Sequence, residues 1–237
     1  MILQYWLFLF LLVGGVMMSI ILDKLTITAA ITGGLLSIVI FLGTGFTGIA
    51  LLGLFFLLGT LATSWRFVEK IGYRLASPSE RKRTTGQVMA NAGVAGFMGL
   101  LCWMFPVEKE LFLLMMAASL SSATADTLSS ELGSLYGKRF YDITSLKPGT
   151  RGENGVISLE GILFGIAGSI LVAIVHGIGW GWSNQFFLIV LCGTLGNLAD
   201  SVLGATLERK QYVGNNVVNF LNTAIAAVFT LILVNIF

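Results

Sequence analysis

The sequence predicts an all-α, polytopic membrane protein with about eight transmembrane helices. Of its 237 residues, 56% are hydrophobic and only 11% are charged, whereas a soluble domain carries about 25% charged residues. Apolar stretches near the length of about 20 residues that a spanning helix needs recur along the whole chain. The 29 glycines fit this class, because small residues let spanning helices approach closely.

Eight segments meet the length requirement, and together they predict a single transmembrane domain over 1–237. Three of them form an N-terminal group within 1–65, and five form a bundle within 87–237 that carries the polar motifs. The connection Gly43–Gly48 is so short that the second and third segments should form a tight antiparallel hairpin. The predicted helices are 3–21, 26–44, 46–65, 87–106, 110–132, 157–176, 185–207 and 216–236.

The basic residues predict the orientation of these helices. Counted by loop, 13 of the 14 Lys and Arg residues fall on one side of the membrane, and only Lys109 falls on the other. Under the positive-inside rule the basic loops are cytoplasmic, so we expect a multi-pass protein of the cell membrane with both termini outside. The basic loop residues are Lys24, Arg66, Lys70, Arg74, Arg81, Lys82, Arg83, Lys138, Arg139, Lys147, Arg151, Arg209 and Lys210.

Polar residues inside the predicted helices gather at one depth, near the cytoplasmic ends. An Asp at the centre of a spanning helix costs about 2.5–3.5 kcal/mol, so such residues normally face a partner or a water-filled site. Their common depth predicts a functional site entered from the cytoplasm. The residues are Asn91, Asp126, Glu131, Glu160, Asp200, Asn215, Asn216 and Asn219.

Two of the acidic residues stand in similar surroundings. Ala125-Asp126-Thr127 matches Ala199-Asp200-Ser201, and the two predicted helices run parallel. We therefore expect Asp126 and Asp200 to approach one another across an interface of small residues, as in folds built from parallel repeats.

A divalent cation would relieve the repulsion between these carboxylates. Mg²⁺ prefers oxygen ligands, is usually held by one or two carboxylates, and completes its shell with water and substrate phosphates. Asp126 and Asp200, assisted by Glu131 or Asn91, fit this requirement. The alternative is that the acidic residues bind neighbouring helices or pair with basic residues of the following loop.

That loop supplies groups suited to an anion. Lys147, Arg151 and several glycines directly precede the sixth predicted helix, so backbone N–H groups, a positive helix end and basic side chains could converge on a phosphate. The alternative is an ordinary glycine-rich turn. No P-loop sequence occurs in the chain. The run Arg81-Lys82-Arg83 is interpreted as a topology signal that touches anionic lipid headgroups.

Carboxylates for Mg²⁺, cations for phosphates and a site within the membrane indicate phosphoryl transfer to or from a lipid. Such catalysis is mostly positioning and charge stabilisation, and it needs no covalent nucleophile from the protein. The only histidine, His176, lies at the opposite end of the sixth predicted helix and is expected to have no catalytic role.

The same residues stand in six ordered blocks that resemble a known family. The family is the integral-membrane proteins of domain of unknown function 92, which includes plant phytyl-phosphate kinase and animal transmembrane protein 19. The blocks cover only the last five predicted helices. They are Gln87–Val94, Ala125–Gly133, Ile143–Thr150, Asn154–Ser158, Asp200–Thr206 and Asn215–Phe220.

The resemblance implies transfer of the terminal phosphate of CTP or ATP to a prenyl phosphate lipid, which gives the diphosphate. In this hypothesis Asp126, Asp200 and Glu131 hold Mg²⁺, and Lys147 and Arg151 act on the nucleotide phosphates. Membrane lipids surround the protein, no nucleic acid is expected as a partner, and no oligomeric state is favoured. The remaining nucleotide- or phosphate-binding candidates are Asn91, Gly149, Thr150, Asn154, Gly155, Ser158, Asn215, Asn216 and Asn219.

Two other functions use the same residues. A transporter or flippase for a lipid or ion also needs intramembrane acidic groups and interrupted helices. A CTP-dependent lipid nucleotidyltransferase differs from the kinase in which phosphate is attacked, and it releases pyrophosphate instead of CDP.

Overall fold

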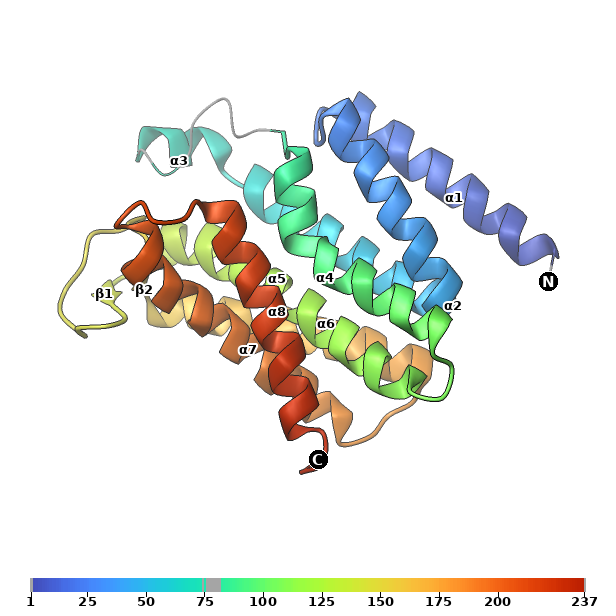
Figure 1. The fold of residues 1–237 in the computed structure, drawn as a ribbon. Coiled ribbons are helices and arrows are strands. Elements are labelled where there is room, and N and C mark those ends of the chain that lie inside the picture. Colours follow the sequence, from blue (N-terminus) through green and yellow to red (C-terminus); the bar gives the residue numbers. More distant parts are fainter. Residues whose placement is uncertain (1, 74, 76–81, 237) are drawn as a thin grey trace.

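The computed structural model describes residues 2–73, 75 and 82–236 and confirms an all-α, polytopic membrane protein (Figure 1). Within these residues, seven helices are long and apolar enough to cross a membrane. The elements are α1 (Ile2–Ile21), α2 (Ile27–Ser64), α3 (Phe67–Gly72), α4 (Thr85–Met104), α5 (Lys109–Tyr136), β1 (Tyr141–Asp142), β2 (Val156–Ile157), α6 (Leu159–Trp180), α7 (Gln185–Leu203), the π-helical turn η2 (Gly204–Glu208) and α8 (Asn215–Leu233).

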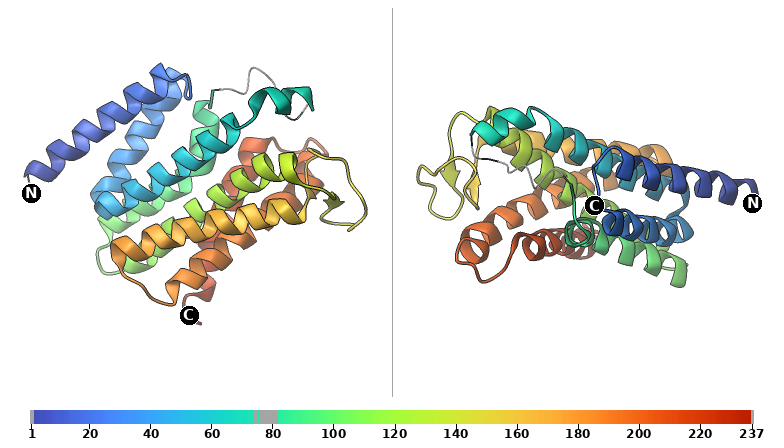
Figure 2. Two further views of the ribbon diagram at one scale, coloured as in Figure 1. Left: turned by 180° about the vertical axis from the view of Figure 1, so that it is seen from behind. Right: turned by 90° about the horizontal axis from the view of Figure 1, so that it is seen from above.

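Helix α2 contains two of the eight predicted spans. A straight helix of its 38 residues would be about 57 Å long, nearly twice the hydrocarbon thickness of about 30 Å. Gly45 interrupts it with a non-helical backbone (φ 69°, ψ −154°), and from there the second arm runs back toward the end where the first began (Figure 2). The hairpin predicted at Gly43–Gly48 is therefore confirmed, and the seven helices supply eight spans.

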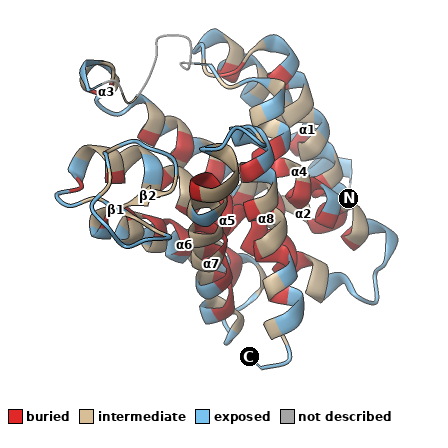
Figure 3. Cartoon of the chain, turned by 60° about the vertical axis from the view of Figure 1, so that its left-hand side comes forward, coloured by how far each residue is buried: buried red, intermediate tan, exposed pale blue. Residues whose placement is uncertain are grey.

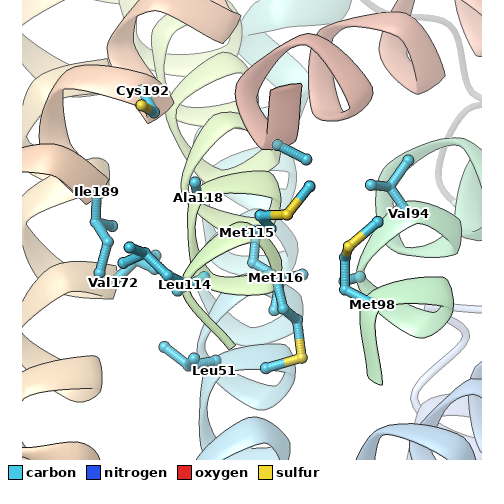
Figure 4. Close-up of a cluster of buried hydrophobic side chains, with 14 of the residues drawn as sticks. Leu51, Val94, Met98, Leu114, Met115, Met116, Ala118, Val172, Ile189 and Cys192 are labelled. Carbon is cyan, nitrogen blue, oxygen red and sulfur yellow. The ribbon is translucent and has the colours of Figure 1, made fainter. Parts of the chain in front are cut away.

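Helix α5 lies at the centre of the bundle. It packs against α2, α4, α6, α7 and α8, and every residue from Leu113 to Ala125 is buried. Apolar side chains from the surrounding helices close around it (Figure 4). This core includes Leu51, Val94, Met98, Leu114, Met116, Val172 and Ile189.

Helix α1 lies at the edge of the bundle and packs mainly against α2 (Figure 1). Only Phe8 and Ser19 of this helix are buried, and the Phe8 ring stacks on Phe41 with 3.9 Å between ring centroids. Most of its other residues are exposed and apolar, whereas the buried residues of the chain concentrate inside the bundle (Figure 3). Such a surface suits a helix that faces lipid.

The basic loops gather at one end of the bundle (Figure 1). The α1–α2 turn, α3, the α5–α6 loop and the η2–α8 turn lie there, whereas the kink of α2 at Gly45, the α4–α5 and α6–α7 turns and both termini lie toward the opposite end. This matches the charge count, although Arg74 and Arg81 lie outside the described residues. Which end faces the cytoplasm stays a prediction.

Candidate functional site

A polar cavity of about 360 Å³ lies at the end of the bundle that carries the basic loops. It lies between α4, α5, α7, η2 and α8, and the α5–α6 loop covers part of it. Carboxylates, amides and hydroxyls dominate its wall, as predicted for a site at this depth. Among the described residues, the carboxylates that line it are Asp126, Glu131, Glu153, Asp200 and Glu208.

Asp126 of α5 and Asp200 of α7 meet inside this cavity, with their carboxyl groups within hydrogen-bonding reach. The structure thus places them as the repeated sequence pattern predicts. A hydrogen-bond chain fixes the pair from the core side. The Ser122 hydroxyl donates to Asn222 Oδ1 (3.0 Å), and Asn222 Nδ2 donates to Asp200 Oδ1 (2.7 Å).

Ser122 and Asn222 were missed by the sequence analysis, and both are fully buried. Asn222 does have a sequence signal. It follows Asn215 by seven positions and Asn219 by three, so the three amides fall on one face of α8. Asn215 and Asn219 line the cavity, whereas Asn222 lies one layer deeper and supports Asp200.

Two amide oxygens of the cavity wall have no hydrogen-bond partner among the described residues. These are Oδ1 of Asn91 and Oδ1 of Asn219, and both atoms are buried. Buried polar atoms are almost always satisfied, so an orphaned acceptor indicates a ligand or ion. Together with the carboxylates of Asp126 and Asp200, they form an all-oxygen donor set of the kind that Mg²⁺ takes.

Glu131 has a different partner from the one predicted. Its carboxylate pairs with Lys70 Nζ of α3 at 2.5 Å, and the Lys70 side chain is only 1% exposed. Five positions along a helix rotate Glu131 about 140° from Asp126, which explains why the two carboxylates diverge. No three His, Cys, Asp or Glu side chains of residues 2–73, 75 and 82–236 form a metal-binding group. The predicted three-carboxylate metal site is therefore not formed.

The α5–α6 loop is held against the end of η2 by Arg209. Arg209 Nη1 pairs with Asp142 Oδ2 at 2.6 Å, and Arg209 Nε donates to the Asn154 carbonyl at 3.0 Å. The hydroxyl of Thr144 and the guanidinium of Arg209 hold the pKa of Asp142 well below its usual range. The pair therefore stays charged at neutral pH and fixes the loop beside the cavity.

Gly155 allows the closest approach between this loop and η2. Its φ is +76°, and a Cβ there would lie 2.3 Å from Cβ of Ala205. A larger residue would thus meet both a disfavoured backbone conformation and a clash. The π-helical turn of η2 begins directly after Asp200's own helix ends, and such turns are frequent at functional sites.

The predicted phosphate cradle is only partly assembled. Asn154, Gly155 and Ser158 line the cavity, and Ser158 Oγ also accepts from Gly161 N (3.1 Å) to cap α6. Lys147 is exposed and does not line it.

Arg151 is held elsewhere, because its guanidinium lies over the rings of Tyr73 and Phe140 and donates to the Gly137 carbonyl (3.3 Å). The convergence of Lys147 and Arg151 on a phosphate is therefore not observed. The other candidates that do not line the cavity are Gly149, Thr150 and Asn216.

Arg83 supplies the cation that the loop does not. Its guanidinium lies over the Phe55 ring, 5.4 Å from the centroid, and it lines the polar cavity. Gly59 makes room for it, because a Cβ there would lie 2.4 Å from Arg83 Nη2. Burial lowers the pKa of Arg83, and the nearby Glu131 carboxylate partly offsets this. Arg83 therefore lies in the cavity wall, a position that the interpretation of Arg81-Lys82-Arg83 as a topology signal did not predict, while Arg81 lies outside the described residues.

A comparison with known proteins identifies the family to which these residues belong. Residues 10–227 match the family described as "Integral membrane protein DUF92". The chain belongs to this family. The match covers most of the chain, including the N-terminal helices in which the sequence analysis recognised no motif.

Three proteins are similar to the chain over most of its length. The chain is 29% identical over 196 residues to "Protein VTE6, chloroplastic" of Arabidopsis thaliana. The aligned region covers 80% of this chain but only 59% of the plant protein. It is 31% identical to an uncharacterized membrane protein of Synechocystis sp., over 81% of this chain and 76% of that protein. An uncharacterized membrane protein of Methanocaldococcus jannaschii is 32% identical, over 78% and 75%. No solved structure matches the chain.

Proposed function

We propose that this protein is a Mg²⁺-dependent kinase that transfers the terminal phosphate of a nucleoside triphosphate, CTP or ATP, to a prenyl phosphate lipid. The observation that carries the proposal is the pairing of Asp126 and Asp200 in a polar cavity that also contains unpaired amide oxygens and Arg83. Resemblance to the family that includes plant phytyl-phosphate kinase supports the substrate class.

The proposed reaction needs no covalent intermediate with the protein. An oxygen of the lipid phosphate attacks the terminal phosphorus of the nucleotide, and the bond between that phosphorus and the bridging oxygen breaks. The products are a lipid diphosphate and a nucleoside diphosphate. The attacking oxygen is already ionised at neutral pH, so no general base is required, which fits a cavity whose lining contains no histidine among the described residues.

The residues divide the work by their chemistry. Asp126, Asp200 and the amide oxygens of Asn91 and Asn219 would hold Mg²⁺. When bound, the ion neutralises negative charge on the phosphates and orients them. Arg83 contributes a fixed positive charge within the same cavity, where a guanidinium matches phosphate oxygens. Asn154, Ser158 and Asn215 line the same cavity and would donate to or accept from the nucleotide.

Transport is a weaker alternative for this fold. A carrier needs a second access route from the opposite side of the membrane. In the described bundle, the layer beyond Ser122 is filled by fully buried apolar residues of α5 such as Leu114, Met116 and Leu120. Because the bundle is closed there, we expect the site to be reached from one side only. We assign that side to the cytoplasm and the protein to the cell membrane.

Single substitutions test the proposed assignment of the aspartates. Asp126→Asn and Asp200→Asn each remove one carboxylate without a change in size, and each should lower transfer to a prenyl phosphate by about 100-fold or more. Purified variants are incubated with CTP or ATP, Mg²⁺ and a panel of prenyl phosphates, and lipid and nucleotide products are read by mass spectrometry. Full activity in either variant would contradict the assignment of that aspartate to Mg²⁺. If the unmodified protein forms no product, the proposed kinase activity is excluded.

A further inference from the structure

A second cavity, of about 250 Å³, lies between α1, the two arms of α2 and α4. Apolar side chains from each of these helices form most of its wall. Polar atoms are confined to a few positions, of which Arg83 and Gln87 lie at the start of α4. Representative apolar residues of the wall are Phe8, Leu12, Leu36, Leu52, Phe56 and Val88.

Arg83 and Gln87 also line the polar cavity that holds Asp126 and Asp200. The two cavities therefore share this pair of side chains in their walls, and one cavity is apolar whereas the other is lined by carboxylates and amides. Among the described residues, no carboxylate lies within ion-pair distance of Arg83, so its positive charge is available at the boundary. A ligand that spans this boundary needs an anionic head and a hydrocarbon tail.

We infer that the apolar cavity between α1, α2 and α4 binds the hydrocarbon tail of the lipid phosphate, and that Arg83, which lines both cavities, binds its phosphate. The inference rests on the proposed function for the identity of the lipid. It gives the N-terminal helices a role in substrate binding, although they contribute none of the aspartates.

Two glycines in the wall are positions at which a larger side chain could partly fill the cavity. Gly33 and Gly53 lie in opposite arms of α2, and a Cβ built at either meets no heavy atom within 4 Å. A leucine at these positions has room to project into the cavity and occupy part of it. Gly14 of α1 is also free of neighbours within 4 Å but does not line the cavity, so Gly14→Leu is the matched control.

The test measures lipid binding without nucleotide, so that it is independent of turnover. The full chain in detergent is titrated with geranylgeranyl monophosphate and with the short isopentenyl monophosphate, and bound lipid is counted by native mass spectrometry. Gly33→Leu and Gly53→Leu should weaken binding of the long lipid by about ten-fold, the equivalent of about 1.4 kcal/mol, and leave the short one unchanged. Gly14→Leu should bind both as the unmodified protein does.

Arg83→Gln tests the head-group contact separately. It should weaken binding of geranylgeranyl monophosphate by about ten-fold and leave binding of the uncharged alcohol geranylgeraniol unchanged. Only the monophosphate has a charged group that can accept a hydrogen bond from the Arg83 guanidinium. The inference is overturned if Gly33→Leu and Gly53→Leu bind the long lipid normally. It is also overturned if phosphatidylglycerol competes equally, since the cavity would then hold membrane lipid. If the unmodified protein binds geranylgeranyl monophosphate but transfers no phosphate to it when nucleotide and Mg²⁺ are added, the result would instead count against the proposed kinase.

Discussion

Asp200 keeps its position through an amide that faces away from the cavity. Asn222 donates to Asp200 and accepts from Ser122, so both ends of this fully buried side chain are satisfied. In a low-dielectric interior each such bond is strengthened, and each lost partner is expensive. We therefore treat Asn222 as a positioning residue for the aspartate pair.

Asn222→Ala should impair both folding and transfer. It removes the side-chain amide that bonds both the Ser122 hydroxyl and the Asp200 carboxyl, and Ser122 keeps only its 3.4 Å bond to the backbone carbonyl of residue 222, so the free energy of unfolding should fall by about 1–3 kcal/mol. Transfer should fall as well, because Asp200 loses its orientation. Thermal unfolding in detergent and the prenyl phosphate assay measure the two effects, and Asn222→Gln should recover part of the activity if orientation is the cause.

Asn235→Ala is the matched control, since Asn235 lies beyond the far end of α8 and is exposed. It should match the unmodified protein in both assays. An Asn222→Ala variant with full activity and normal stability would show that the hydrogen-bond chain does not support the site.

The residues of the site show what sequence alone predicts. Asp126 and Asp200 were found because charged groups are rare inside spanning helices. Lys147 was favoured over Arg83 because of the glycines around it, whereas the structure places Arg83 in the cavity and leaves Lys147 exposed. Composition near a helix end does not tell which way a long side chain points, because loop geometry decides it.

At the scale of elements, the short helix α3 is fixed to α5 by an ion pair. Lys70 Nζ contacts Glu131 and donates to the Ala62 carbonyl at 2.7 Å, with almost no exposure to solvent. Glu131→Gln leaves the ammonium with carbonyl partners only. Its cost should lie near the lower end of the about 3–5 kcal/mol measured for broken buried pairs, because Glu131 is 25% exposed.

A double-mutant cycle separates this ion pair from simple packing. Lys70→Met and Glu131→Gln should each lower the thermal midpoint in detergent, while the double variant should lose less than the sum of the two. Additive losses would mean that Lys70 and Glu131 contribute independently and that α3 is not fastened in this way. Replacement of the exposed Lys210 by Met provides a control for the loss of a lysine charge.

The hairpin in α2 could be predicted, whereas α3 could not. Two membrane-length apolar stretches separated by a few residues leave the chain no choice but to fold back. Helix α3 has only six residues, Phe67–Gly72, in a loop interpreted only by its charge. Its buried lysine depends on a partner 61 positions away, which no local pattern reveals.

At the scale of the whole molecule, the fold was predictable because the membrane imposes it. Spanning segments must satisfy their backbone groups internally, so length and hydropathy fix the helices, and basic residues group the loops. Which side chains line a common cavity depends on helix rotation and packing instead. The two cavities that share Arg83 and Gln87 in their walls therefore became evident only from the structure.

The position of a phosphate label tests the central claim most directly. The protein is incubated with Mg²⁺, a prenyl phosphate and CTP or ATP that is labelled in parallel reactions at the terminal or at the innermost phosphate. The account predicts that only the terminal label enters the lipid and that a nucleoside diphosphate is released. Entry of the innermost label with release of pyrophosphate would show a nucleotidyltransferase. Absence of both labels from the lipid would contradict phosphoryl transfer altogether.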